Sequence, residues 1–427
     1  MPKSVSFRKG LSSLLFWSVI SAAFIGPGTV TTAAKAGAGF GLALLWALFF
    51  STLATILLQE AAARITIASG QSLGQVLNQK FQGPGGQFLR NSLFFAVAFG
   101  CAAYQTGNIL GALSGIELIA KFPSWIPLLL IGGIATALLL LGNIVWIARC
   151  LGLLVAIMGA LFIYLATQLD LHALDILSSA FKPTFPEGAT LLITALIGTT
   201  IVPYNLFLAS GISRSQNLRE MRIGLILAIA IGGIISMAIL LVGTSVEGAF
   251  SFEALAATLY QQLGPWAARL LALGLFAAGL SSAITAPLAA AVTGSSLLNW
   301  KPQGTKYKAT WMSILAIGLL FSLLQVKPIP AIILAQAING VLLPFVAIFL
   351  FLAVNDRHIL GDRFVNHPAI NVLFLLITGL AVWLGLHNII RLFDPESTEY
   401  WTLFLKGGGV LFTWVFLILR ISNSSKQ

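Results

Sequence analysis

The sequence repeats long apolar runs from one end to the other, and these runs restrict its fold more than any other feature. Each run has at least about 18 residues, enough for a helix to cross a hydrocarbon core of about 30 Å. In lipid a helix satisfies its own backbone hydrogen bonds, whereas an open strand edge does not. Only 9% of the residues are charged, against roughly a quarter in a soluble domain. We therefore expect an all-α polytopic membrane protein.

Twelve transmembrane spans are predicted along the chain. The connections between them are ordinary loops, and no soluble domain interrupts the series, so residues 1–427 are expected to form one transmembrane domain. The spans cover residues 12–38, 42–68, 88–118, 125–143, 147–168, 188–212, 221–244, 266–298, 310–325, 329–353, 369–388 and 401–420.

Lys and Arg are distributed unevenly over the predicted loops. Of the 24, 17 lie on the side of the N-terminus, and this bias predicts that both termini of this multi-pass protein are cytoplasmic and that it lies in the cell membrane (the inner membrane). The same distribution explains the net charge of +11. A basic soluble face is missing, so nucleic acid is excluded as a partner. The seven on the opposite side are Lys35, Lys121, Lys182, Arg269, Lys327, Arg391 and Lys406.

Two spans are interrupted near their middles. Residues 26–29 of span 1 read Gly-Pro-Gly-Thr, and residues 202–205 of span 6 read Val-Pro-Tyr-Asn. Glycine and proline weaken helical hydrogen bonding, so each helix should unwind there. A single interruption could be a tolerated kink, but a pair at matching positions of two five-span halves indicates a secondary transporter with a binding site near the midplane.

These motifs resemble those of the NRAMP family (natural resistance-associated macrophage proteins). Residues 26–29 stand where the family has Asp-Pro-Gly-Asn, and residues 202–205 stand where it has Met-Pro-His-Asn. The resemblance implies a LeuT-type fold of two inverted repeats of five spans. The repeats would cover residues 12–168 and 188–353, followed by two additional helices at 369–420.

The departures from the family pattern affect its metal ligands. The family binds transition metals through the Asp carboxylate, the Asn amide and the Met thioether, whose places are taken here by Gly26, Thr29 and Val202. The family's proton route uses acidic residues of span 3 and the span 6 His. Gln105 and Asn108 occupy the acidic positions, and Tyr204 replaces the His. We therefore expect neither metal binding nor proton coupling as the family performs them.

Without a carboxylate, the helix ends are expected to control the charge of the substrate. A half-helix begins with unpaired N–H groups and a partial charge of about +0.5, which favours an anion. Bicarbonate fits such a pocket, and the chain resembles an NRAMP-related branch associated with bicarbonate uptake. The prediction is an importer of a small inorganic anion. Its substrate-binding residues would be Gly26, Pro27, Gly28, Thr29, Val30, Thr31, Thr199, Thr200, Val202, Tyr204, Asn205 and Gln336.

An anion entering a negatively charged cell needs a driving ion, and Na⁺ is the expected coupling ion. LeuT-type folds bind sodium between span 1 carbonyls and span 8 hydroxyls, and the spacing of Ala278, Ser281 and Ser282 resembles that pattern. Ala23 and Gly26 would supply the carbonyls. The alternative is that these small residues only let two helices pack closely.

Two other functions remain open on the sequence alone: a divalent metal cation transporter (Mg²⁺ or Mn²⁺-like) of relaxed selectivity, and a non-transporting membrane sensor. Enzymatic activity is not expected, because no nucleophile lies beside a base and no Walker loop is present. No cofactor is expected besides the coupling ion. The expected partners are the substrate, Na⁺ and the lipid bilayer, and the sequence predicts no oligomeric state.

Overall fold

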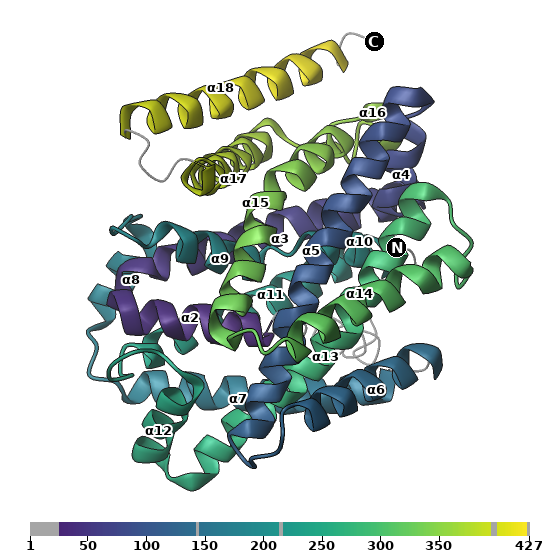
Figure 1. Cartoon of the computed structure of the whole chain (residues 1–427). Helices are drawn as coiled ribbons and strands as arrows, with labels where there is room; N and C mark the ends of the chain where they lie inside the picture. The colour runs from purple at the N-terminus through teal and green to yellow at the C-terminus, as the bar shows by residue number, and fades with distance from the viewer. Residues whose placement is uncertain (1–24, 142–144, 213–216, 394–398, 425–427) are drawn as a thin grey trace, which may run out of the picture.

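The computed structural model describes residues 25–141, 145–212, 217–393 and 399–424. Within these ranges every regular element is a helix (Figure 1). The elements are α2 Pro27–Phe40, η1 Gly41–Leu44, α3 Leu45–Ser69, α4 Leu73–Lys80, α5 Gly83–Glu117, α6 Trp125–Leu141, α7 Val145–Gln168, α8 Ala173–Phe181, α9 Thr190–Thr200, α10 Pro203–Ile212, α11 Leu218–Gly243, α12 Phe252–Leu263, α13 Pro265–Leu298, α14 Thr305–Leu323, α15 Pro328–Val354, α16 Arg357–Leu360, α17 Pro368–Phe393 and α18 Glu399–Ser424.

The predicted all-α membrane architecture is confirmed. Each expected span coincides with a helix, or with the pair α9 and α10 for span 6. Of span 1, residues 12–24 lie outside the described residues. In the described part of the chain, nine helical stretches are long and apolar enough to cross a membrane, and α6 is a shorter apolar helix. The repeat boundaries at 12–168 and 188–353 stay a prediction.

Four short helices in the connections, α4, α8, α12 and α16, were not predicted. Three of them, α4, α12 and α16, begin at polar residues whose side chains cap the helix. The Ser72 hydroxyl accepts from the backbone N–H of Gln75, whose side chain in turn accepts from the backbone N–H of Ser72. The Ser251 hydroxyl accepts from the N–H of Ala254 at the start of α12, and the Asp356 carboxylate accepts from the N–H of His358 at the start of α16. This local capping stabilises short helices that carry no transmembrane apolar run.

Small residues let the central helices approach closely. α13 packs along α5, and α2 packs against α11. A Cβ built at Gly279 of α13 would meet the backbone of Asn108 and Ala112 on α5. A Cβ at Gly37 of α2 would overlap the carbonyl of Leu240 on α11. In lipid such close packing supplies the attraction between helices that water supplies in soluble proteins.

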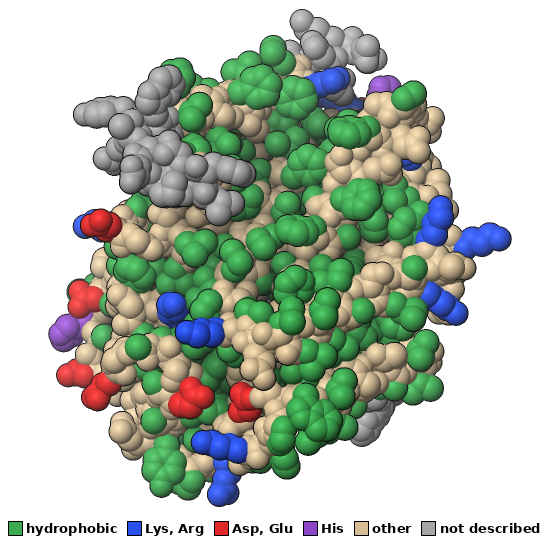
Figure 2. Space-filling view, viewed as in Figure 1, with side chains coloured by type: hydrophobic (Ala, Val, Ile, Leu, Met, Phe, Trp, Pro, Cys, Tyr) green, Lys and Arg blue, Asp and Glu red, His purple; other side chains and the backbone are tan. Residues whose placement is uncertain are grey.

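The surface separates apolar and charged side chains. Figure 2 shows a face covered largely by hydrophobic side chains, with acidic side chains at its left and lower part and only Lys and Arg along its right edge. The right edge of that view is where Figure 1 draws the starts of α5 and α14. We call this end of the bundle the basic end. The orientation expected from the loops, with both termini in the cytoplasm, stays a prediction.

The two C-terminal helices pack on the side of α15. α17 contacts α15, and Trp414 of α18 donates to the carbonyl of Leu375 on α17 at 2.8 Å. α17 also reaches the first half of span 6, because Asn388 donates to the Thr194 hydroxyl of α9 at 2.6 Å. The additional helices are therefore tied to one of the broken spans.

Candidate functional site

Span 6 is broken between α9 and α10, as the sequence predicts. α9 ends at Thr200, and Ile201 leaves the helical region with a ψ of 85°. α10 begins at Pro203, which has no N–H to continue the ladder of α9. The carbonyl of Val202 accepts from the N–H of Asn205 at 3.0 Å and so starts the second half-helix.

In span 1 the described helix, α2, begins at the predicted interruption. Gly26 is extended, with φ −90° and ψ 176°, and Pro27 occupies the first position of α2. No side chain caps this helix end, and α2 has no acidic residue in its first turn. Proline fits this first helical position because it has no N–H to pair.

The two breaks meet through a pair of threonines. The Thr29 hydroxyl of α2 lies 3.1 Å from the Thr199 hydroxyl of α9. Both side chains are buried, with exposed fractions of 2% and 3%. Two residues that are 170 positions apart thus place neutral oxygens at one point between the half-helices.

Gln336 of α15 completes this meeting point. A Cβ built at Gly28 would overlap the Gln336 amide, so the side chain of Gln336 lies directly over the start of α2. The backbone of Gln336 also lies against Gly198 of α9, where a Cβ would overlap its carbonyl. Gly198 allows the backbones of α9 and α15 to approach, and Gly28 leaves space for the Gln336 amide over the start of α2.

Tyr204 and Asn205 form the opposite side of the span 6 break. Tyr204 packs edge-to-face on Tyr104 of α5, with ring centroids 6.0 Å apart. The Tyr104 hydroxyl donates to the carbonyl of Gly198 at 2.9 Å, which holds the end of α9 against α5. Asn205 is 5% exposed.

Some predicted hydrogen-bond donors are already engaged by their own helices. The Thr31 hydroxyl donates to the carbonyl of Pro27 at 2.7 Å, and the Thr200 hydroxyl donates to that of Leu196 at 3.1 Å. Their hydrogens are therefore not available to an anion, although their oxygens still present lone pairs. Val30 and Val202 are buried and contribute only apolar surface.

Buried amides near the breaks have atoms without hydrogen-bond partners among the described residues. Each of these side chains is at most 5% exposed. An unpaired buried amide is costly, and native structures usually pair it with water or a ligand. The atoms are Gln59 Oε1, Gln105 Oε1, Asn108 Nδ2, Asn205 Nδ2, Gln336 Oε1 and Asn339 Nδ2.

The residues expected to bind sodium are brought together only in part. A Cβ built at Gly26 would lie 3.3 Å from the Ser282 hydroxyl, so span 1 and span 8 do touch there. Ala278 is buried and Ser281 is half-buried. The carbonyl of Ser281 accepts from the Thr285 hydroxyl at 2.9 Å. Ala23 lies outside the described residues.

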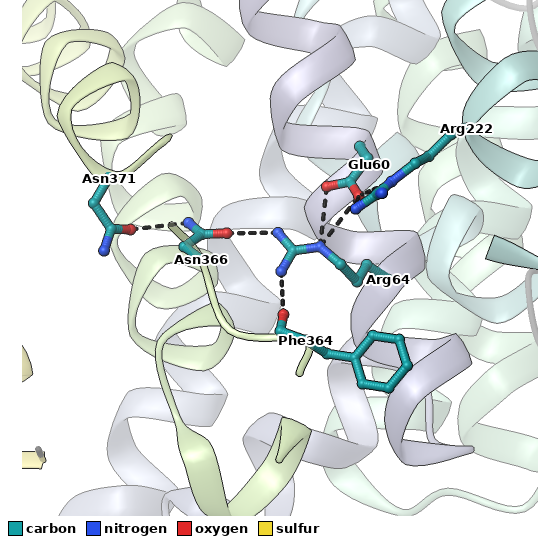
Figure 3. A network of polar contacts seen from close by, with 6 residues as sticks. All are labelled: Glu60, Arg64, Arg222, Phe364, Asn366 and Asn371. Atoms are coloured by element: carbon teal, nitrogen blue, oxygen red, sulfur yellow. Dashed lines mark hydrogen bonds and ion pairs between the residues drawn. The ribbon is translucent and has the colours of Figure 1, made fainter. Parts of the chain in front are cut away.

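Carboxylates lie away from this meeting point. Figure 3 shows that Glu60 is held by Arg64 and Arg222, while Arg64 also donates to the Phe364 carbonyl and to Asn366. The other acidic residue within the predicted spans, Glu117, accepts from Ser124 at 3.1 Å. Among the described residues no three His, Cys, Asp or Glu side chains gather into a metal site. The site at the breaks is therefore neutral.

Two residues that hold the site were missed by the sequence analysis, Tyr104 and Thr55. The Thr55 hydroxyl of α3 lies 3.3 Å from the Thr200 carbonyl, and it also donates to Ser51. Ser51, Thr55 and Gln59 recur every four residues, so they share one face of an otherwise apolar span. That polar stripe was a signal that could have placed α3 beside the break.

Comparisons with known proteins find relatives that are named as metal transporters. The chain is 25% identical over 389 residues to the divalent metal cation transporter MntH of Verminephrobacter eiseniae, covering 83% of this chain and 84% of the relative. It is 27% identical to MntH of Bacillus subtilis, covering 90% and 93%. The fold matches a crystal structure of the Eremococcus coleocola manganese transporter with a TM-score of 0.77 and 18% identity, over 99% and 97% of the two chains. The transporter Mhp1 matches at 0.62 with 13% identity, over 97% and 92%.

The prediction of a sodium-coupled importer of bicarbonate is wrong. The relatives that match over most of the chain are named as divalent metal cation transporters, and a manganese transporter shares its fold. The physical error was to infer the charge of the substrate from a missing carboxylate. Hydroxyls and amides present oxygen lone pairs as well as donors, so a neutral site accepts a cation that keeps part of its water.

The same relatives correct the expected partners, a small inorganic anion and Na⁺. The membrane architecture and the transporter class do not depend on that error. The family model for "Natural resistance-associated macrophage protein-like" proteins matches residues 18–391, which is most of the chain. The chain belongs to the natural resistance-associated macrophage protein-like family of membrane transporters.

Proposed function

We propose that this protein is a secondary transporter of a divalent metal cation, Mg²⁺ or Mn²⁺-like, with relaxed selectivity. The observation that supports it most is the convergence of neutral polar side chains from three helices, those of Thr29, Thr199 and Gln336. Hard divalent cations prefer oxygen ligands, and Mg²⁺ usually keeps several of its waters. The names of the relatives support the same substrate class.

Relaxed selectivity follows from the chemistry of the ligands. A thioether or thiolate favours softer transition metals, whereas hydroxyl, amide and carbonyl oxygens favour Mg²⁺, Ca²⁺ and Mn²⁺. Val202 places an apolar side chain at the break. The site would therefore distinguish ions by size and hydration, and it would bind them weakly because it offers no negative charge to offset dehydration.

Transport would occur by alternating access around the two breaks. The ion path would be lined by residues 26–31, by residues 199–205 and by Gln336. In the cell membrane, with both termini in the cytoplasm, the membrane potential favours entry of a cation by about 2.3 kcal/mol per charge for each 100 mV.

The test is divalent-metal influx into liposomes that contain the purified protein, read with a fluorescent indicator. Wild-type protein should carry both Mn²⁺ and Mg²⁺ faster than protein-free liposomes. Gln336→Leu removes an amide oxygen from the site and should raise the KM for either ion about tenfold, which corresponds to about 1.4 kcal/mol. Gln261→Leu, at an exposed position of α12, is the matched control and should leave the KM unchanged. Absence of influx of either metal would refute the proposal.

A further inference from the structure

A cavity lies at the basic end, between the first turns of α5 and the connection from α13 to α14. Its volume is about 380 Å³. It is separate from the helix breaks and shares no residue with them. The lining residues are Gln87, Arg90, Asn91, Phe94, Phe95, Leu298, Trp300 and Lys306.

The polar side of this cavity is cationic. Arg90 and Lys306 line it, and no acidic side chain does. Within the described chain neither cation forms an ion pair with a carboxylate. The Nε of Arg90 donates to the Gly86 carbonyl at 3.4 Å, which directs the guanidinium along α5. Gln87 and Asn91 add neutral amide donors.

The start of α14 adds to the positive potential. Lys306 belongs to its first turn, which has no acidic residue, and the N-cap Gly304 makes no side-chain hydrogen bond. The unpaired N–H groups of such a helix end attract an anion. This contribution supports the two side chains and would not make a site without them.

The floor of the cavity is a fixed aromatic pair. Phe94 and Trp300 pack edge-to-face with ring centroids 5.0 Å apart. A Cβ at Gly294 would overlap Trp300, so glycine makes room for the ring. The Ser295 hydroxyl donates to the Trp300 carbonyl at 3.0 Å and anchors the loop. The cavity is therefore built into the fold and is not a gap between mobile side chains.

An exposed apolar strip continues from the cavity along α5. Phe95 is 67% exposed and Phe99 is 60% exposed, one turn apart on the same face. On a helix that crosses the membrane, these side chains face lipid. An occupant of the cavity thus has cations and amides around one end and an apolar helix face beside the other.

We infer that this cavity binds the phosphate headgroup of an anionic membrane lipid, whose acyl chains lie along α5. Two cations without an opposing carboxylate complement the phosphate, and the apolar strip complements the chains. Basic pockets between transmembrane helices on the cytoplasmic side bind such headgroups in general. A free phosphate would bind the two cations but would make no contact with the apolar strip.

The test is native mass spectrometry of the detergent-purified full-length protein with added phosphatidylglycerol or phosphatidylcholine. The wild-type protein should retain one phosphatidylglycerol in preference to phosphatidylcholine. Arg90→Gln combined with Lys306→Gln should weaken phosphatidylglycerol binding roughly 30-fold, because each cation near a lipid surface contributes about 1 kcal/mol. Millimolar inorganic phosphate should not displace the lipid.

Lys301→Gln is the matched control, since Lys301 is exposed beside the cavity but does not line it. It should bind phosphatidylglycerol like the wild type. An equal loss in Lys301→Gln would show only a general attraction to the basic end and would overturn the site. Displacement by inorganic phosphate would assign the cavity to a free anion. An unchanged affinity in a double variant that elutes and melts like the wild type would also refute the inference.

Discussion

At the scale of single residues, the site depends on a glycine that leaves space for a side chain from another helix. Gly28 lies in the first turn of α2, beneath the Gln336 amide. The amide occupies the space that a Cβ at this position would need. The amide is the far end of a flexible side chain, so a methyl group would displace it without forcing the backbones apart. Gly198 differs, because its Cβ would overlap the backbone carbonyl of Gln336.

Gly28→Ala is therefore expected to impair transport more than stability. The displaced Gln336 amide should raise the KM for divalent metal about tenfold, while the unfolding temperature changes little. Gly39→Ala is the control on the same helix, because nothing lies within 4 Å of a Cβ built there. The measurements are liposome influx and thermal unfolding. If both variants had the same KM as the wild type, Gln336 would not act through its position over Gly28.

Some of these residues could be predicted from sequence and some could not. The prolines and glycines of the two breaks are local signals, so residues 26–29 and 202–205 were found directly. Thr55 and Tyr104 belong to other spans and hydrogen-bond to the C-terminal end of α9, so their partners depend on tertiary packing. The polar stripe of α3 could have suggested its position beside the break, but the hydrogen bonds of Thr55 and Tyr104 became apparent only in the packed structure.

At the scale of helices, the polar face of α5 carries amides at the positions where the family's proton route has acidic residues. Gln105 and Asn108 are buried amides, and amides do not ionise. The phenols of Tyr104 and Tyr204 are neutral at physiological pH, since an ordinary phenol titrates near pH 10. This face therefore offers no group that could carry a proton in step with the metal.

Divalent-metal influx should accordingly proceed without proton movement. Its rate should stay constant between about pH 6 and about pH 8, where none of these groups titrates. A pH-sensitive dye inside the liposomes should report no acidification as metal enters. Acidification proportional to metal influx would show that a proton route exists through other residues.

The ends of α3 and α11 are joined at the basic end by the ion network of Figure 3. Arg64 is 5% exposed and Glu60 is 14% exposed, so their pairing at 3.1 Å is largely shielded from water. Arg222 joins Glu60 at 2.7 Å from α11. One carboxylate thus offsets two guanidinium groups. Arg64 also donates to the Phe364 carbonyl and to the Asn366 side chain, and these bonds fix the loop before α17.

Glu60→Gln should destabilise the protein by roughly 2–4 kcal/mol, because it leaves a buried Arg64 beside Arg222 without a counter-charge. Asp362→Asn is the matched control. Its carboxylate is 87% exposed and pairs with Arg357 at 3.6 Å, and exposed pairs contribute little. Thermal unfolding in detergent measures both. Equal unfolding temperatures for Glu60→Gln and the control would contradict a structural role for the network.

At the scale of the whole molecule, the sequence predicted the architecture far better than the substrate. Apolar runs and loop charges report on the membrane, which imposes the same length and apolar character on every span. In the proposed site, substrate identity would depend on a few atoms where α2, α9 and α15 converge. At Thr29, Thr199 and Gln336 the side chains offer both donors and lone pairs, so residue types alone did not fix the sign of the ligand charge.

The most direct measurement is an anomalous difference map from crystals of this protein soaked in Mn²⁺. The account predicts one peak between the start of α2 and the break of span 6, within ligand or water-bridged distance of Thr29, Thr199 and Gln336. Soaking Gln336→Leu crystals should weaken that peak. A manganese peak elsewhere in the bundle, with none at the two breaks, would contradict the central claim.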